Sequence, residues 1–313
     1  LATDLVPEED HPKVVGLMYV MLLLGMALSA LIYGALLSNY SPGRLIQVIQ
    51  GTAVLTVGLN LFAIWKQESR DRNRAQQMQT TKHPTFVQAW SQLIARPGMV
   101  RLMVVIGLGT FGFGMADVLL EPYGAQALGL SVGQTTQLTA LLALGTLAGF
   151  GYASYTLANG GVPANLGRIG ATIGVPGFLA IVLSAGIIGT PLFLLGVFAT
   201  GLGAGLFGHA TLTAAIRAAP TDQVGLSLGA WGAVQATCAG IGIALAGLTR
   251  DVLVGLESLS GIQPETPYNV VFMVEIAFLI AAILLARSLA ATDRNGRKAA
   301  ILTDTRPNPL EVS

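Results

Sequence analysis

Two carboxylates, Asp117 and Glu121, lie four residues apart at the end of an apolar run that is long enough to cross a bilayer. On a single helix they would share one face. There, two acids can hold one proton, bind a cation or accept hydrogen bonds from the start of the next helix. We expect Pro122 and Gly124 to end the helix directly after them. In a purely structural role, the pair would only fix the turn between two spans.

Two further polar residues lie inside apolar runs. Glu275 would be costly as an unpaired charge in hydrocarbon, so it should be protonated, paired or facing water, and proton coupling is one candidate role. His209 follows the small residues Gly205 and Gly208, and a neutral imidazole can ligate the magnesium of a chlorin. A hydrogen bond to a neighbouring helix would also explain His209, and close helix packing would also explain the glycines.

The sequence contains no recognisable enzyme motif. It shows no metal-ligand cluster, no nucleophile paired with a base, no phosphate loop and no dinucleotide fingerprint. Its one cysteine, Cys238, lies within an apolar run and has no partner for an internal disulfide. We therefore expect a protein without enzymatic activity and without a bound metal.

Composition places the chain in a membrane. The hydrophobic fraction is 53%, charged residues are 11% and the mean hydropathy is +0.66, whereas about a quarter of a soluble domain is charged. Eight apolar runs are long enough for spanning helices and too long for barrel strands. The sequence thus predicts an all-α polytopic membrane protein with spans at 14–37, 45–65, 99–120, 132–157, 169–188, 192–216, 226–248 and 270–289.

Lysine and arginine are concentrated in alternate loops, which predicts the orientation because cationic loops stay in the cytoplasm. The opposite loops hold only Arg44 and Arg250, together with acidic residues such as Glu257. Both termini are then predicted to be cytoplasmic. The basic residues act as topology signals, so no nucleic-acid partner is expected. The predicted cytoplasmic set is Lys13, Lys66, Arg70, Arg72, Arg74, Lys82, Arg96, Arg101, Arg168, Arg217, Arg287, Arg294, Arg297, Lys298 and Arg306.

A weak internal repeat suggests the fold. Pro7, Gly16 and Gly34 match Pro220, Gly229 and Gly247 at one constant offset of about six spans, as in the two parallel halves of a major facilitator. The eight helices would be the fifth to the twelfth of twelve, with the first four absent from this sequence. We predict four parts: the last two spans of the N-terminal half (1–65), a cytoplasmic linker (66–98), a six-helix C-terminal half (99–290) and a cytoplasmic tail (291–313).

Two cytoplasmic segments give further expectations. In the linker, apolar residues recur at helical spacing, which predicts a short amphipathic helix that rests on lipid headgroups or docks a partner. These residues are Phe86, Val87, Trp90, Leu93 and Ile94. The loop at 155–172 contains Arg168 but lacks the acidic residue of the facilitator gating motif. This absence argues against an actively rocking transporter.

Two long blocks carry a family resemblance: residues 3–51, which begin TDLVPEEDHPKVVGLMY, and residues 115–149, which begin MADVLLEPYGAQALGLSVGQ. They closely resemble the PucC family of purple phototrophic bacteria, light-harvesting complex assembly proteins that are distant major facilitators. The resemblance runs along the whole chain and is weakest in the linker and the tail. The family's signature residues correspond to Asp117, Glu121, Pro122, Tyr123 and Gly124, and its cytoplasmic motif to Asp4, Pro7, Glu8 and Glu9.

The resemblance implies an assembly factor in the inner, intracytoplasmic photosynthetic membrane. Its expected partners are light-harvesting antenna polypeptides, the reaction centre, bacteriochlorophyll synthase and membrane lipid, and its expected cofactor is transiently held bacteriochlorophyll. From the residues themselves, we place pigment contacts at His209, Gly205 and Gly208. Two alternatives stay open: a proton-coupled transporter that uses Glu275 or Asp117, and a scaffold that never touches pigment.

Overall fold

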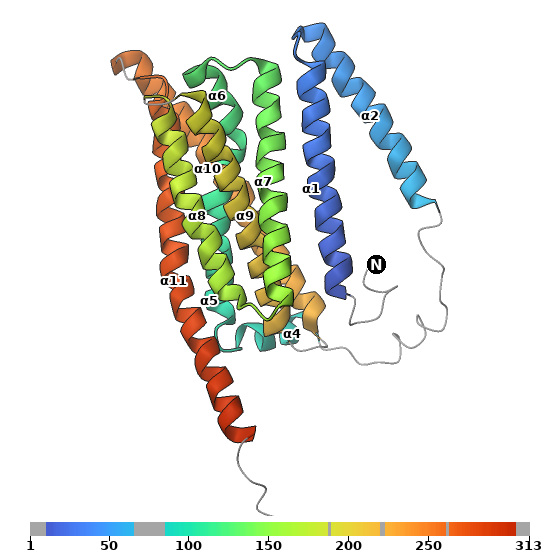
Figure 1. Ribbon diagram of the computed structural model, residues 1–313, viewed down its shortest axis with the longest axis vertical. Helices are drawn as coiled ribbons and strands as arrows, with labels where there is room; N and C mark the ends of the chain where they lie inside the picture. The colour runs from blue at the N-terminus through green and yellow to red at the C-terminus, as the bar shows by residue number, and fades with distance from the viewer. Residues whose placement is uncertain (1–10, 66–84, 187–188, 220–222, 261–262, 305–313) are drawn as a thin grey trace, which may run out of the picture.

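The computed structural model describes residues 11–65, 85–186, 189–219, 223–260 and 263–304, and all regular elements within these ranges are helical. Each apolar run predicted from the sequence corresponds to one long helix or to part of one, except the run at 99–120, which is divided between several elements (Figure 1). The elements are α1 (His11–Leu36), α2 (Pro42–Ile64), α4 (Phe86–Ile94), α5 (Met99–Gly114), the 3-10 turn η2 (Ala116–Val118), α6 (Leu120–Leu128), α7 (Val132–Ala158), α8 (Pro163–Ser184), α9 (Thr190–Ala218), α10 (Val224–Ser260) and α11 (Thr266–Asp304).

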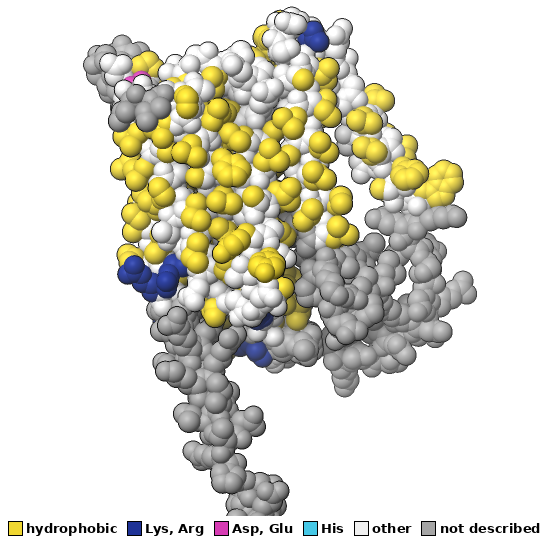
Figure 2. All heavy atoms as spheres, in the orientation of Figure 1, with side chains coloured by type: hydrophobic (Ala, Val, Ile, Leu, Met, Phe, Trp, Pro, Cys, Tyr) yellow, Lys and Arg dark blue, Asp and Glu magenta, His cyan; other side chains and the backbone are white. Residues whose placement is uncertain are grey.

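The prediction of a polytopic all-α membrane protein is confirmed. Among the described residues, seven helices are long and apolar enough to cross a membrane, and α1 contributes a shorter apolar stretch, Val20–Leu36. Hydrophobic side chains cover the face in Figure 2, and its Lys and Arg side chains lie at the two ends. The outer surface of the bundle is therefore suited to hydrocarbon along its length and to water at its ends.

Several helix boundaries differ from the prediction. Helix α8 begins earlier than expected, at Pro163, because proline is favoured in the first turn, where its missing N–H needs no partner. Helices α10 and α11 run beyond the predicted apolar segments, so the predicted tail at 291–313 is helical as far as Asp304. The motif residues Asp4, Pro7, Glu8 and Glu9, and the linker residues 66–84, lie outside the described residues.

Helices α5 to α11 form the bundle, and α1 lies against α7 (Figure 1). The α1–α7 contact is close, because a Cβ atom added at Gly133 would lie 2.9 Å from the carbonyl oxygen of Gly34. Helix α2 has no buried residue. Three clusters of buried apolar side chains lie between Leu93 and Ala286. Outside these clusters, α1 adds the buried residues Leu23, Ala27 and Ala30.

We call the two ends of the bundle the α4 end and the α6 end, after the short helices that lie there (Figure 1). Chain direction places Arg96, Arg101, Arg168, Arg217 and Arg287 at the α4 end, whereas Arg44 and Arg250 lie at the α6 end. This distribution agrees with the predicted orientation, in which the α4 end faces the cytoplasm. That orientation stays a prediction.

The predicted amphipathic linker helix is present as α4. A capping box starts it: Thr85 Oγ1 accepts from the Gln88 backbone N–H, and the Gln88 side chain accepts from the Thr85 backbone N–H. Leu93 is fully buried in a cluster that includes Met99 and Trp231. Val87, in contrast, is 74% exposed. Helix α4 is therefore anchored to the bundle on one face and free on the other.

Candidate functional site

The chain breaks between α5 and α6, where the sequence predicted one continuous helix. Helix α5 ends at Gly114, the turn η2 follows, and α6 starts at Leu120. The prediction that Asp117 and Glu121 share one helical face is therefore wrong. Glu121 accepts a hydrogen bond from Thr139 Oγ1 of α7 at 2.9 Å, while Asp117 lines a cavity described below.

Pro122 and Gly124 do not end a helix, contrary to the prediction. Pro122 lies in the first turn of α6, where a missing N–H disrupts no helical hydrogen bond. Gly124 is buried, and a Cβ atom there would lie 3.1–3.3 Å from Leu130, Leu138 and Phe193. The helix ends instead at Gly129, whose φ of 66° is the left-handed conformation that glycine adopts readily.

Glu275 of α11 occupies the break between α5 and α6. Its side chain is fully buried, and Oε1 accepts a short hydrogen bond from the backbone N–H of Ala116. Its other oxygen, Oε2, is buried and has no hydrogen-bond partner among the described residues. Glu275 therefore contacts Ala116, the residue before Asp117. Its side chain satisfies a backbone N–H that the helix break leaves without a helical partner.

A central cavity of about 560 Å³ lies beside this break. Its wall combines the aromatic rings of Phe113, Phe178, Phe207 and Trp231 with the polar side chains of Asp117 and Gln235, and residues of α1, α5, α7, α8, α9 and α10 contribute to it. Gly208 forms part of the wall, and no atom lies within 4 Å of a Cβ atom built there. The cavity can hold a flat apolar group with one polar contact at Asp117.

The two other predicted pigment residues do not line this cavity. Gly205 packs against α7, because a Cβ atom there would collide with the carbonyl oxygen of Thr146. This contact contradicts the prediction that Gly205 offers a pigment surface, since the backbone of α7 already covers it. The His209 ring packs on Phe150 with ring centroids 4.1 Å apart. Its Nδ1 atom is buried without a hydrogen-bond partner in the described part of the chain.

Tyr123, from the family signature, holds the α6 end together. Its fully buried hydroxyl donates to the carbonyl oxygen of Ile181 at 2.9 Å and lies 3.2 Å from Ser184 Oγ. The ring packs edge-on against Tyr268 and Phe272 of α11. This motif residue therefore joins α6 to α8 and α11.

Sequence reasoning missed a second polar network at the α6 end. Tyr268 donates its hydroxyl proton to Gln126 Oε1 at 2.7 Å, and Arg250 Nη2 donates to the Tyr268 hydroxyl at 3.1 Å. Arg250 also pairs with Asp251 at 2.8 Å. The network joins α6, α10 and α11, and its only signal in the sequence is an arginine on the side where cations are rare.

The comparisons with known proteins agree with this architecture. A family model described as "PUCC protein" matches residues 1–293. The chain belongs to this PUCC family. It is 63% identical over 299 residues to "Protein PucC" of Rhodobacter capsulatus, and 49% identical over 298 residues to "Protein PucC" of Cereibacter sphaeroides. These matches cover 95% and 94% of this chain, and it spans 64% of the length of both relatives.

A solved structure supports the fold of this PUCC-family chain. A bacterial homologue of the human lysosomal transporter Spinster, in an inward-facing and unoccupied conformation, aligns with a TM-score of 0.65 and 18% sequence identity. The alignment covers 91% of this chain and 73% of the other. The major facilitator fold predicted from the internal repeat is therefore confirmed.

Proposed function

We propose that this protein is an assembly factor for bacterial light-harvesting complexes, which holds or delivers bacteriochlorophyll while antenna polypeptides insert into the membrane. The observation that carries the proposal is membership of the PUCC family across residues 1–293. Its clients would be core or peripheral antenna polypeptides and the reaction centre, and bacteriochlorophyll synthase would supply the pigment. The protein would act without enzymatic chemistry in the intracytoplasmic photosynthetic membrane.

The central cavity supports pigment handling. A macrocycle with a long tail needs apolar surface more than it needs polar ligands, and most of the residues that line the cavity are apolar or glycine. Asp117 adds one polar group, and the Gly208 wall leaves open space. His209 lies outside this cavity, so we propose shape and apolar contact there, rather than ligation by His209, as the main source of pigment affinity.

The test is an absorption spectrum and a polypeptide inventory of the protein purified in mild detergent from a strain that makes bacteriochlorophyll. Gly208→Leu adds a side chain to the wall of the central cavity, where no atom lies within 4 Å of a built Cβ, and should lower bound pigment several-fold. Gly151→Leu is the matched control, because Gly151 is exposed, has no atom within 4 Å of a built Cβ and does not line the cavity. His209→Ala tests the ligand hypothesis separately.

Three outcomes distinguish the alternatives. Stoichiometric pigment that falls in Gly208→Leu but not in Gly151→Leu supports pigment carriage in the central cavity. If the amount of bound pigment falls only in His209→Ala, the pigment site is at the α7–α9 interface. If antenna polypeptides co-purify and pigment follows only their amount, the protein is a pigment-free scaffold.

A proton-coupled transporter is the second candidate. It is favoured by two acids near the break: Asp117 lines the central cavity, and Glu275 is fully buried and accepts a hydrogen bond from the Ala116 N–H. Uptake into vesicles that depends on a proton gradient and disappears in Glu275→Gln would support it. Uptake that does not depend on the proton gradient would favour the assembly role.

A further inference from the structure

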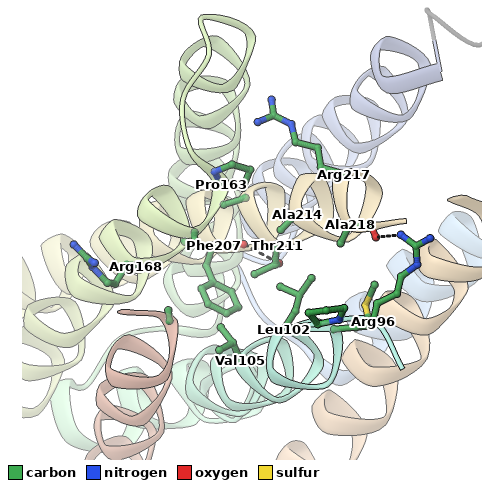
Figure 3. A pocket seen from close by; sticks show the side chains of 17 residues that line it. Arg96, Leu102, Val105, Pro163, Arg168, Phe207, Thr211, Ala214, Arg217 and Ala218 are labelled. Carbon is green, nitrogen blue, oxygen red and sulfur yellow. Dashed lines mark hydrogen bonds between the residues drawn. The ribbon is translucent and has the colours of Figure 1, made fainter. Parts of the chain in front are cut away.

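A second cavity, of about 490 Å³, opens at the α4 end of the bundle. We call it the arginine cavity, because the charged residues among the described residues that line it are Arg96, Arg168 and Arg217 (Figure 3). The wall comes from the α4–α5 junction and from α5, α8, α9 and α11.

The interior of the arginine cavity is apolar. Leu102 and Val105 of α5 face Phe207 and Ala214 of α9 across it, as Figure 3 shows. The charged residues lie around this centre, and in Figure 3 the guanidinium groups of Arg168 and Arg217 point away from it. The cavity thus combines an apolar interior with a cationic rim, which is the pattern that an anionic amphiphile requires.

Backbone carbonyl groups hold two of the arginines in place. Arg96 Nη1 donates to the Ala218 carbonyl at 3.1 Å, at the end of α9. Arg217 donates to the carbonyls of Gly161 at 3.2 Å and Leu157 at 3.3 Å. The ion pair found among the described residues, Arg250 with Asp251, involves none of these three arginines. Each guanidinium has five N–H donors, and these contacts use only one or two.

Two helix starts add to the positive potential. Helix α5 begins after Gly98 and α8 begins after Val162, and neither start has a side-chain cap. Gly98 and the first α8 residues, Pro163 and Ala164, line the arginine cavity. The partial positive charge of an uncapped helix start favours anions, and phosphate is a common ligand at such positions.

We infer that the arginine cavity binds the phosphate headgroup of an anionic membrane phospholipid, with part of an acyl chain against Phe207 and Leu102. A lipid fits better than a free phosphate, because a small anion alone would leave the apolar interior unfilled. The cavity also adjoins the start of α5, directly after the amphipathic helix α4. This inference is independent of the pigment proposal.

The test uses native mass spectrometry of the purified, delipidated protein with added phosphatidylglycerol, phosphatidylcholine or inorganic phosphate. Arg168→Gln is the central variant, since it removes a rim charge without removing a hydrogen bond found in the structure. We expect phosphatidylglycerol to bind about tenfold more weakly to it, as for loss of one charged hydrogen-bond donor. Arg101→Gln is the matched control, because Arg101 lies in the first turn of α5 and does not line the cavity.

The apolar interior is tested by a second variant, Ala214→Leu, which narrows the cavity and leaves all three arginines in place. It should also weaken phosphatidylglycerol binding, so the inference stays testable if Arg168→Gln fails to fold. Equal binding of phosphatidylglycerol and phosphatidylcholine would overturn the inference, as would equal losses in Arg168→Gln and Arg101→Gln. Inorganic phosphate that binds as tightly as the lipid would overturn the lipid assignment and indicate a soluble phosphate ligand.

Discussion

The side chain of Glu275 accepts a hydrogen bond from the backbone N–H of Ala116, which lies 159 residues earlier in the chain. This contact connects α11 to the break between α5 and α6. A buried N–H without a partner is costly, so Glu275 makes the break tolerable within the membrane. The same break places Asp117 on the wall of the central cavity.

Replacing Glu275 should show what this contact contributes. Glu275→Gln keeps a carbonyl oxygen that can accept from Ala116, whereas Glu275→Leu leaves that N–H buried without a partner. We expect Glu275→Leu to lose about 1–3 kcal/mol of unfolding free energy more than Glu275→Gln. Denaturant unfolding of the purified protein measures the difference, and Met273→Leu, at an exposed position of α11, is the control. Equal losses for Gln and Leu would show that Ala116 finds another acceptor.

The glycines of α9 should divide into two classes. Gly205→Ala forces a Cβ atom into the Thr146 carbonyl, so it should destabilise the protein by about 1–3 kcal/mol, as overpacking does. Gly208→Ala meets open space and should be neutral or slightly stabilising, since alanine favours the helix more than glycine does. Thermal unfolding of the two variants in the same detergent measures these two changes in stability. A large loss in Gly208→Ala would contradict the assignment of Gly208 to the cavity wall.

The network at the α6 end should be energetically coupled. The Tyr268 hydroxyl and Gln126 Oε1 lie 2.7 Å apart, so a double-mutant cycle of Tyr268→Phe and Gln126→Ala should give a coupling of about 0.5–1.5 kcal/mol. A parallel cycle of Tyr268→Phe with Thr139→Val, which removes a bond made to Glu121, is the control and should be additive. Additivity in both cycles would mean that the Tyr268–Gln126 bond does not stabilise this end.

The start of α4 depends on Thr85. Thr85→Ala removes the side-chain acceptor for the Gln88 N–H and should destabilise the helix by about 1 kcal/mol, whereas Thr85→Ser retains the cap. Hydrogen exchange of residues 87–94 should become faster in Thr85→Ala alone. Unchanged exchange would indicate that burial of Leu93, rather than the cap, holds α4 in place.

The sequence predicts the helices well because the bilayer leaves few alternatives. A long apolar run must satisfy its own backbone groups, so hydropathy alone locates α2, α7 and α9. The break after Gly114 could not be predicted in this way. The backbone N–H of Ala116 is satisfied by Glu275, which is distant in the sequence and has no apparent partner there. Likewise, Gly205 and Gly208 look alike in the sequence. Only the position of α7 shows that one of them packs and the other faces a cavity.

The position of the core has a consequence for how the protein is made. The three apolar clusters include no residue of α1 or α2, and α1 touches the rest of the bundle chiefly along α7. One continuous stretch of translation therefore supplies all three clusters, whereas the wall of the central cavity also needs Met26 of α1. We expect the three clusters of α4–α11 to pack first, with α1 then docking onto α7 and completing the wall of the central cavity.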